Sequence, residues 1–202
     1  MTKIKVCGLM DLQDIDYANE AMPDYVGFVF APSKRRISSE LAWEMNKELN
    51  PKIRSVGVFV NETIETIVRI VQEGIISLVQ LHGDEDARYI QELRKQIQAP
   101  IIKAINMQET GQYSLLTNFD TDYLLLDTGK GGTGQTFDWK LTKHCPTPFF
   151  LAGGLNPSNL GEAIRATDPF GVDLSSGLEK DGRKDLSLMK EAVSIAHARN
   201  YT

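Results

Sequence analysis

A cysteine and an aspartate stand at the ends of two short apolar runs in this chain. Cys7 follows the run 4–6 and precedes Gly8, and Asp127 follows the run 123–126. A thiol and a carboxyl group can each accept or donate a proton. If the two groups face the same cavity, they predict general acid–base chemistry. Each residue alone is ordinary, because a cysteine often packs as a small apolar side chain and an aspartate often caps a turn. Their joint placement at strand ends favours catalysis.

Other apolar runs are also followed by polar or glycine residues. These are His82 and Gly83 after the fourth run, Gly153 and Gly154 after the seventh, and Asp173, Ser175, Ser176 and Gly177 at the eighth. Glycines let a ligand approach the backbone closely, and exposed N–H groups at a helix start attract an anion. The glycine-rich run 129–134 could add N–H donors as a cover. The pattern predicts a phosphate-like anion site, with plain tight turns as the alternative.

Eight apolar runs, and the helical segments between them, must position these residues. The runs span 4–6, 25–30, 56–60, 78–81, 101–105, 123–126, 149–152 and 171–174. Between them apolar residues recur at helical spacing, and Ser38 and Asn156 have residue types typical of helix N-caps. Units of about 25 residues approach the smallest βα repeat, and an open doubly wound sheet usually has fewer strands. We therefore expect an α/β fold, a single (β/α)8 TIM barrel over residues 1–202, with 108–118 as its weakest helical segment.

Composition limits the classes of partner. The 202 residues carry a formal net charge of −5 at pH 7, which argues against nucleic acid or an anionic membrane as a partner. We expect neither a signal peptide nor a membrane span, because no apolar stretch is suitable. The two cysteines lack CxxC spacing, so free thiols and a cytoplasmic location are expected.

Three other residues receive structural interpretations. Cys145 precedes the seventh run, so it should lie at the face of the barrel opposite Cys7. His144 beside it makes only a weak zinc pattern, because no second pair of ligands is present. His197 lies close to the last residues and is expected to be solvated.

Nine short motifs occur in order along the chain. They are KVCG at 5–8, VGFVF at 26–30, SKRRIS at 33–38, VGVFVN at 56–61, VQLHG at 79–83, LLDT at 125–128, GGTGQTFDW at 131–139, LAGGLNP at 151–157 and VDLSSGLE at 172–179. The set resembles the phosphoribosylanthranilate isomerase family of tryptophan biosynthesis. The departures are few: Thr133 replaces the usual serine and Gln135 the usual lysine. The motif register puts Arg35 at the family's substrate arginine and Arg36 at a variable position.

The resemblance implies an Amadori rearrangement of N-(5-phosphoribosyl)anthranilate to 1-(2-carboxyphenylamino)-1-deoxyribulose 5-phosphate. It implies Asp127 as the acid that opens the sugar ring and Cys7 as the base that removes the C2 proton, with no cofactor and no metal. The implied substrate-binding residues are Arg35 for the anthranilate carboxylate, His82 beside the anthranilate, and Gly154, Ser175 and Ser176 for the phosphate, with Asp173 and Gly177 in the same loops.

Both proposed catalytic groups need perturbed pKa values near neutral pH. The pKa of Asp127 must rise from about 3.9 and that of Cys7 must fall from about 8.5. We expect burial and the substrate's carboxylate to raise the first, and a nearby positive charge or helix terminus to lower the second.

Several alternatives stay open. The histidine-pathway isomerase typically has an aspartate where this chain has Cys7, and indole-glycerol-phosphate synthase relies on lysines and a glutamate at strand ends, whereas only Lys103 ends a strand here. A catalytically silent phosphate-binding barrel would retain ligand binding without turnover, and the intact Cys7 and Asp127 argue against it. A cysteine hydrolase would need a His–Asn pair placed to activate Cys7. We expect a monomer.

Overall fold

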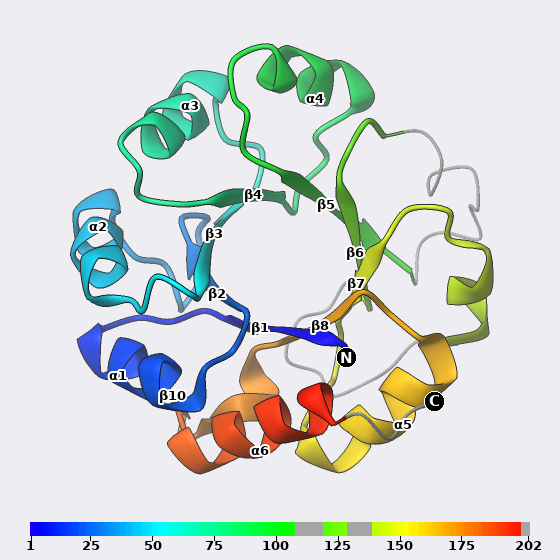
Figure 1. The fold of residues 1–202 in the computed structure, drawn as a ribbon. Coiled ribbons are helices and arrows are strands. Elements are labelled where there is room, and N and C mark those ends of the chain that lie inside the picture. The colour runs from blue at the N-terminus through cyan, green and yellow to red at the C-terminus, as the bar shows by residue number, and fades with distance from the viewer. Residues whose placement is uncertain (108–118, 129–138, 199–202) are drawn as a thin grey trace.

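Eight parallel strands close into a barrel in the computed structural model, and helices surround them (Figure 1). The structure describes residues 1–107, 119–128 and 139–198. The strands are β1 (Lys3–Cys7), β2 (Tyr25–Val29), β3 (Arg54–Phe59), β4 (Leu78–Leu81), β5 (Ile101–Asn106), β6 (Tyr123–Asp127), β7 (Phe149–Leu151) and β8 (Gly171–Leu174). Each strand pairs with the next in parallel, and β8 pairs back with β1, where Asp173 stands opposite Lys5. The expected (β/α)8 barrel is confirmed.

Helices form the outer layer of the described chain. They are α1 (Leu12–Ala21), α2 (Ser39–Glu48), α3 (Ile64–Gln72), α4 (Ala87–Arg94), α5 (Pro157–Thr167) and α6 (Leu186–His197), with the short 3-10 helices η2 (Trp139–His144) and η3 (Ser176–Leu178). Each of these α-helices follows a residue whose side chain accepts a backbone N–H of the first turn, including Ser38 and Asn156. A two-stranded hairpin, β9 (Glu179–Lys180) and β10 (Arg183–Lys184), leads into α6.

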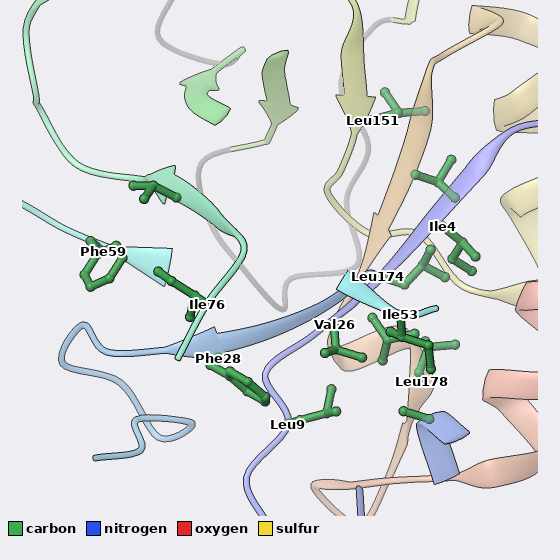
Figure 2. Close-up of a cluster of buried hydrophobic side chains, with 14 of the residues drawn as sticks. Ile4, Leu9, Val26, Phe28, Ile53, Phe59, Ile76, Leu151, Leu174 and Leu178 are labelled. Atoms are coloured by element: carbon green, nitrogen blue, oxygen red, sulfur yellow. The ribbon is translucent and has the colours of Figure 1, made fainter. Parts of the chain in front are cut away.

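Alternation along the strands separates two apolar layers. Ile4, Val26 and Leu174 belong to the large cluster between the sheet and the helices (Figure 2). A second cluster gathers one side chain or more from each of β2 to β7, among them Tyr25 and Phe150, and side chains from so many strands meet only inside the barrel. Because side chains alternate across a strand, the residues between the outward-facing ones point into the barrel.

Two expected segments lie outside the described residues, namely the weak helical segment 108–118 and the glycine-rich run 129–134. Among the described helices, none combines the length and the apolar character that crossing a bilayer requires.

Candidate active site

Cys7 is the last residue of β1 and points into the barrel, because its neighbours on the strand, Ile4 and Val6, face the helices. Cys7 is 8% exposed. A Cβ added to Gly27, the residue opposite on β2, would lie 2.8 Å from Cys7 Sγ and 3.3 Å from Lys5 Nζ. The missing side chain of Gly27 thus makes room for a thiol beside an ammonium group.

Lys5 lies two residues before Cys7 and its side chain is completely buried. Its Nζ atom donates to Asp173 Oδ1 of β8 at 2.8 Å, and its ammonium group also interacts electrostatically with Cys7. Burial acts to lower the pKa of Lys5, but Asp173 and Cys7 outweigh it and hold that pKa above its usual value. Lys5 is therefore a cation inside the barrel.

The Cys7 thiol is not acidified in the substrate-free protein. Burial, assisted by the charge of Asp173, raises its pKa, while Lys5 and Lys184 act in the opposite direction and only partly offset this. The expected positive charge is present, but the expected net decrease in pKa is wrong, because a buried thiolate loses its hydration.

Asp127 is the last residue of β6, at the same end of the barrel as Cys7. Its Oδ2 atom lies 3.5 Å from His82 Nε2, and its Oδ1 atom accepts the N–H of Thr128 at 2.7 Å. Burial acts to raise the pKa of Asp127, but the interactions with His82 and Thr128 outweigh it and lower that pKa. The expected increase is therefore wrong for the substrate-free protein, in which Asp127 is a carboxylate at neutral pH.

His82 follows β4 and is held from its other side by the side-chain amide of Gln80, whose Nε2 atom lies 2.9 Å from His82 Nδ1. His82 and Asp127 face a hollow of about 320 Å³ at the ends of β3 to β6, also lined by Val60, Asn61, Gly83, Asp84, Ala104, Ile105 and Asn106. A hollow of about 560 Å³ lies between α2 and α3 on the outside of the barrel, and none of the predicted site residues lines it.

Arg35 reaches toward the same end of the barrel as Cys7. A Cβ on Gly8 would lie 2.4 Å from Arg35 Cδ and 3.4 Å from Ser175 Oγ, so the arginine crosses directly over Gly8. Its Nε and Nη2 atoms donate to the two carboxylate oxygens of Glu179 at 2.7 and 3.0 Å. Arg36 is exposed. The two arginines thus differ in their surroundings, since Arg35 is bound to Glu179 and Arg36 is exposed.

The loops after β7 and β8 pack against each other. Gly153 and Gly154 have φ values of 87° and 66°, which favour glycine, and α5 begins just beyond them. A Cβ on Gly177 would lie 2.0 Å from the carbonyl oxygen of Leu155. Ser175 Oγ donates to the carbonyl oxygen of Cys7 at 3.0 Å, which joins these loops to β1.

Glu179 and Lys184 complete this part of the site. Lys184 Nζ donates to Glu179 Oε1 and to the carbonyl oxygen of Ser175, both at 3.0 Å. Burial acts to raise the pKa of Glu179, but Arg35 and Lys184 outweigh burial, and the net result is a pKa lowered to about 2. No group of three or more metal-ligating side chains occurs within the part of the chain that the structure describes.

The family model that matches this chain is described as N-(5'-phosphoribosyl)anthranilate (PRA) isomerase and covers residues 4–194. The chain belongs to this family. A PRA isomerase of Endomicrobium trichonymphae is 46% identical over 199 residues, which are 96% of this chain and 98% of the relative. A solved PRA isomerase in complex with reduced 1-(o-carboxyphenylamino)-1-deoxyribulose 5-phosphate is 36% identical, with a TM-score of 0.82 over 97% of this chain and 98% of that chain. Crystallised monomers of a dimeric PRA isomerase from Thermotoga maritima are also 36% identical, with a TM-score of 0.81 and the same coverage.

Membership of the PRA isomerase family confirms the resemblance and makes this chain an isomerase of tryptophan biosynthesis. It decides against the two sister phosphosugar barrels. The expectation that Lys103 ends a strand is wrong, because it is the third residue of β5 and its Nζ atom pairs with Glu85 Oε2 at 2.8 Å.

The sequence interpretation missed three charged residues near Cys7, namely Lys5, Glu179 and Lys184. Lys5 carried a usable signal, because it stands between Ile4 and Val6 in a strand and must therefore face the side opposite theirs. Glu179 and Lys184 gave no such signal, since their pairing depends on how the β9–β10 hairpin returns to the barrel.

Two structural interpretations can be compared with the structure. His197 is not simply solvated, because its Nε2 atom lies 2.9 Å from Asp24 Oδ2. Cys145 is a half-buried free thiol before β7 and donates to the carbonyl oxygen of Thr147.

Proposed function

We propose that Cys7 is the general base and Asp127 the general acid of the Amadori rearrangement of N-(5-phosphoribosyl)anthranilate. The observation that carries this proposal is that Cys7 and Asp127 are the last residues of β1 and β6, at one end of the barrel. Each lies beside a residue that shifts its pKa. Lys5 interacts electrostatically with the thiol of Cys7, and His82 lies beside the carboxylate of Asp127.

The reaction requires two proton transfers at different atoms. Asp127 protonates the furanose ring oxygen, which opens the ring to a protonated imine. Cys7 then takes the proton from C2, and the C–H electron pair forms the C1=C2 bond of an enolamine, which becomes the ketone. Asp127 must first gain a proton, and the anthranilate carboxylate entering the hollow that it shares with His82 favours this by raising its pKa.

Two anionic groups of the substrate require separate binding sites. Arg35 suits the anthranilate carboxylate, because Glu179 occupies only two of its five N–H groups and leaves a planar, charged donor edge. The phosphate would be held by Gly154, Ser175, Ser176 and Gly177 and the N–H groups of their loops, with Asp173 beside them. The glycine conformations at 153–154 and the adjoining start of α5 support this. His82 would contact the anthranilate.

Loss of anthranilate fluorescence from freshly made phosphoribosylanthranilate tests this assignment. The wild-type protein is expected to consume the substrate, and Asp127→Asn to lower kcat/KM by at least about 100-fold, since a general acid supplies roughly that much or more. A value within about threefold of wild type would remove Asp127 from the acid role. Binding without turnover by the wild type would favour a silent phosphate-binding barrel.

We further propose that residues 1–202 act as one barrel domain, that the protein is a cytoplasmic monomer, and that it needs no cofactor or metal. Large apolar side chains that are well exposed among the described residues come from four separate places, Met1, Leu12, Trp43 and Val60. Two free thiols suit a reducing compartment. Light scattering after size exclusion should give about the chain mass of 22.5 kDa, and twice that mass would show a dimer.

A further inference from the structure

Five charged side chains, all mostly buried, gather at the part of the barrel end that holds Cys7. They are Lys5, Asp173, Lys184, Glu179 and Arg35, whose side chains are 0, 10, 0, 6 and 17% exposed. Three are cations and two are carboxylates, so this group carries one excess positive charge while Cys7 is a thiol. Lys5 and Lys184 favour a thiolate at Cys7, and Asp173 opposes it.

Within this group Lys5 is the cation that shares β1 and its inward face with the thiol. Its Nζ atom and Cys7 Sγ lie 3.3 and 2.8 Å from one point above Gly27, and each group shifts the pKa of the other. An ammonium group has three N–H donors, and Asp173 takes one of them at 2.8 Å. Two donors of Lys5 are therefore not used by Asp173, and the ammonium group lies near the sulfur above Gly27.

The other charged groups near Cys7 have different partners. Lys184 on β10 is occupied by Glu179 and the carbonyl oxygen of Ser175, and it acts on Cys7 only through its charge. Asp173 on β8 opposes a thiolate, and Arg35 is bound to Glu179. The hydroxyl of Ser175 donates to the carbonyl oxygen of Cys7 and not to its sulfur.

A completely buried lysine needs a reason in a barrel interior. An ammonium group loses several kcal/mol of hydration on burial, and one partly exposed carboxylate is an incomplete replacement. An apolar residue would fill the same position without that cost. A thiolate that forms beside the ammonium supplies the missing second anion, and it does so only when Cys7 is in its basic form.

We propose that Lys5 is a positioning residue of the isomerase, which holds Cys7 Sγ toward the substrate and stabilises its thiolate by a charged N–H···S hydrogen bond. This rests on the proposed role of Cys7 as the base. Lys5 keeps its own proton throughout, because Asp173 also binds it. The C2 proton goes to sulfur, the C–H electron pair enters the C1=C2 bond, and the S–H proton is then released to water.

The test is the pH dependence of Cys7 alkylation by iodoacetamide, followed peptide by peptide with mass spectrometry. Cys145 in the same molecule is the reference thiol. Lys5→Met is expected to raise the midpoint of Cys7 by about one pH unit or more, which is about tenfold less thiolate at neutral pH. The midpoint reports thiolate formation, whereas altered access would change the plateau rate at high pH.

Lys3→Met is the matched control. Lys3 lies on the same face of β1 and pairs with Asp24 at 2.7 Å, but it is remote from the sulfur, so its loss should leave the midpoint unchanged. Asp173→Asn should move the midpoint of Cys7 in the opposite direction, downward, since its carboxylate opposes the thiolate.

A midpoint for Lys5→Met within about 0.3 pH unit of wild type would overturn the proposal. If that variant does not fold, the Asp173→Asn result decides, and an unchanged or higher midpoint there would also overturn it. Turnover by Cys7→Ala separates the two claims: retained turnover would remove Cys7 from the base role, while the alkylation midpoint still reports whether Lys5 stabilises its thiolate.

Discussion

Glu85 is a buried carboxylate outside the proposed catalytic pair, and we expect its removal to cost much stability. Its Oε2 atom accepts Lys103 Nζ at 2.8 Å and the N–H of Gly83 at 2.9 Å, and its Oε1 atom accepts the N–H of Asn61 at 2.8 Å. The side chains of Glu85 and Lys103 are only 1 and 4% exposed. Removing one partner leaves the other charge buried and unpaired.

Such a loss typically costs about 3–5 kcal/mol, so Glu85→Met should lower the free energy of unfolding in urea by that amount. For a chain of this size the melting temperature should fall by about 6–20 °C. The double variant Glu85→Met, Lys103→Met should recover part of the loss, because both charges are then gone. It should still lack acceptors for the two N–H groups, at about 1 kcal/mol each.

A double-mutant cycle in urea distinguishes a coupled pair from two independent residues. We expect the free energies of unfolding lost in Glu85→Met and Lys103→Met, added together, to exceed the loss in the double variant by at least about 2 kcal/mol. A cost below about 1 kcal/mol for Glu85→Met, or additive losses in the cycle, would refute the reasoning. Because Gly83 and Asn61 line the hollow beside His82, turnover should fall as well.

Three further predictions follow from the residues near Cys7. Arg35→Ala should raise KM and lower kcat/KM by at least about tenfold, whereas Arg36→Ala should change kcat/KM less than about threefold, and equal effects would contradict the assigned register. The pKa of Glu179 is lowered to about 2, so the stability that it supplies is complete above its unfolded-state pKa and is lost as pH falls toward about 2. Urea unfolding between pH 3 and 7 should therefore show a weaker loss on acidification for Glu179→Gln than for wild type. Gly177→Ala should destabilise the protein by about 1–3 kcal/mol, because its Cβ would collide with a backbone oxygen of Leu155, and a melting temperature equal to wild type would show that the loops can separate.

The strand order could be predicted from the sequence because each strand is a short apolar run ended by a turn residue. Ser38 and Asn156 likewise predicted the starts of α2 and α5, since N-capping is a local interaction. The candidate site was predictable where position along a strand decides it, as for Cys7 and Asp127 at the ends of β1 and β6.

The pKa values could not be predicted, because each is a balance between burial and partners from distant strands. A positive charge near Cys7 was expected without its residue being identified, and burial outweighs the effect of Lys5 in the substrate-free protein. For Asp127 the reverse holds, since His82, which follows β4, and Thr128 together outweigh burial. Pairings such as Arg35 with Glu179 join residues 144 positions apart and depend on the closed barrel.

The most direct test of the central claim is kcat/KM for phosphoribosylanthranilate with Cys7→Ala and wild type side by side. If Cys7 is the base, the variant should lose at least about 100-fold while keeping the wild-type fold and substrate affinity. Turnover within about threefold of wild type would show that another group removes the C2 proton.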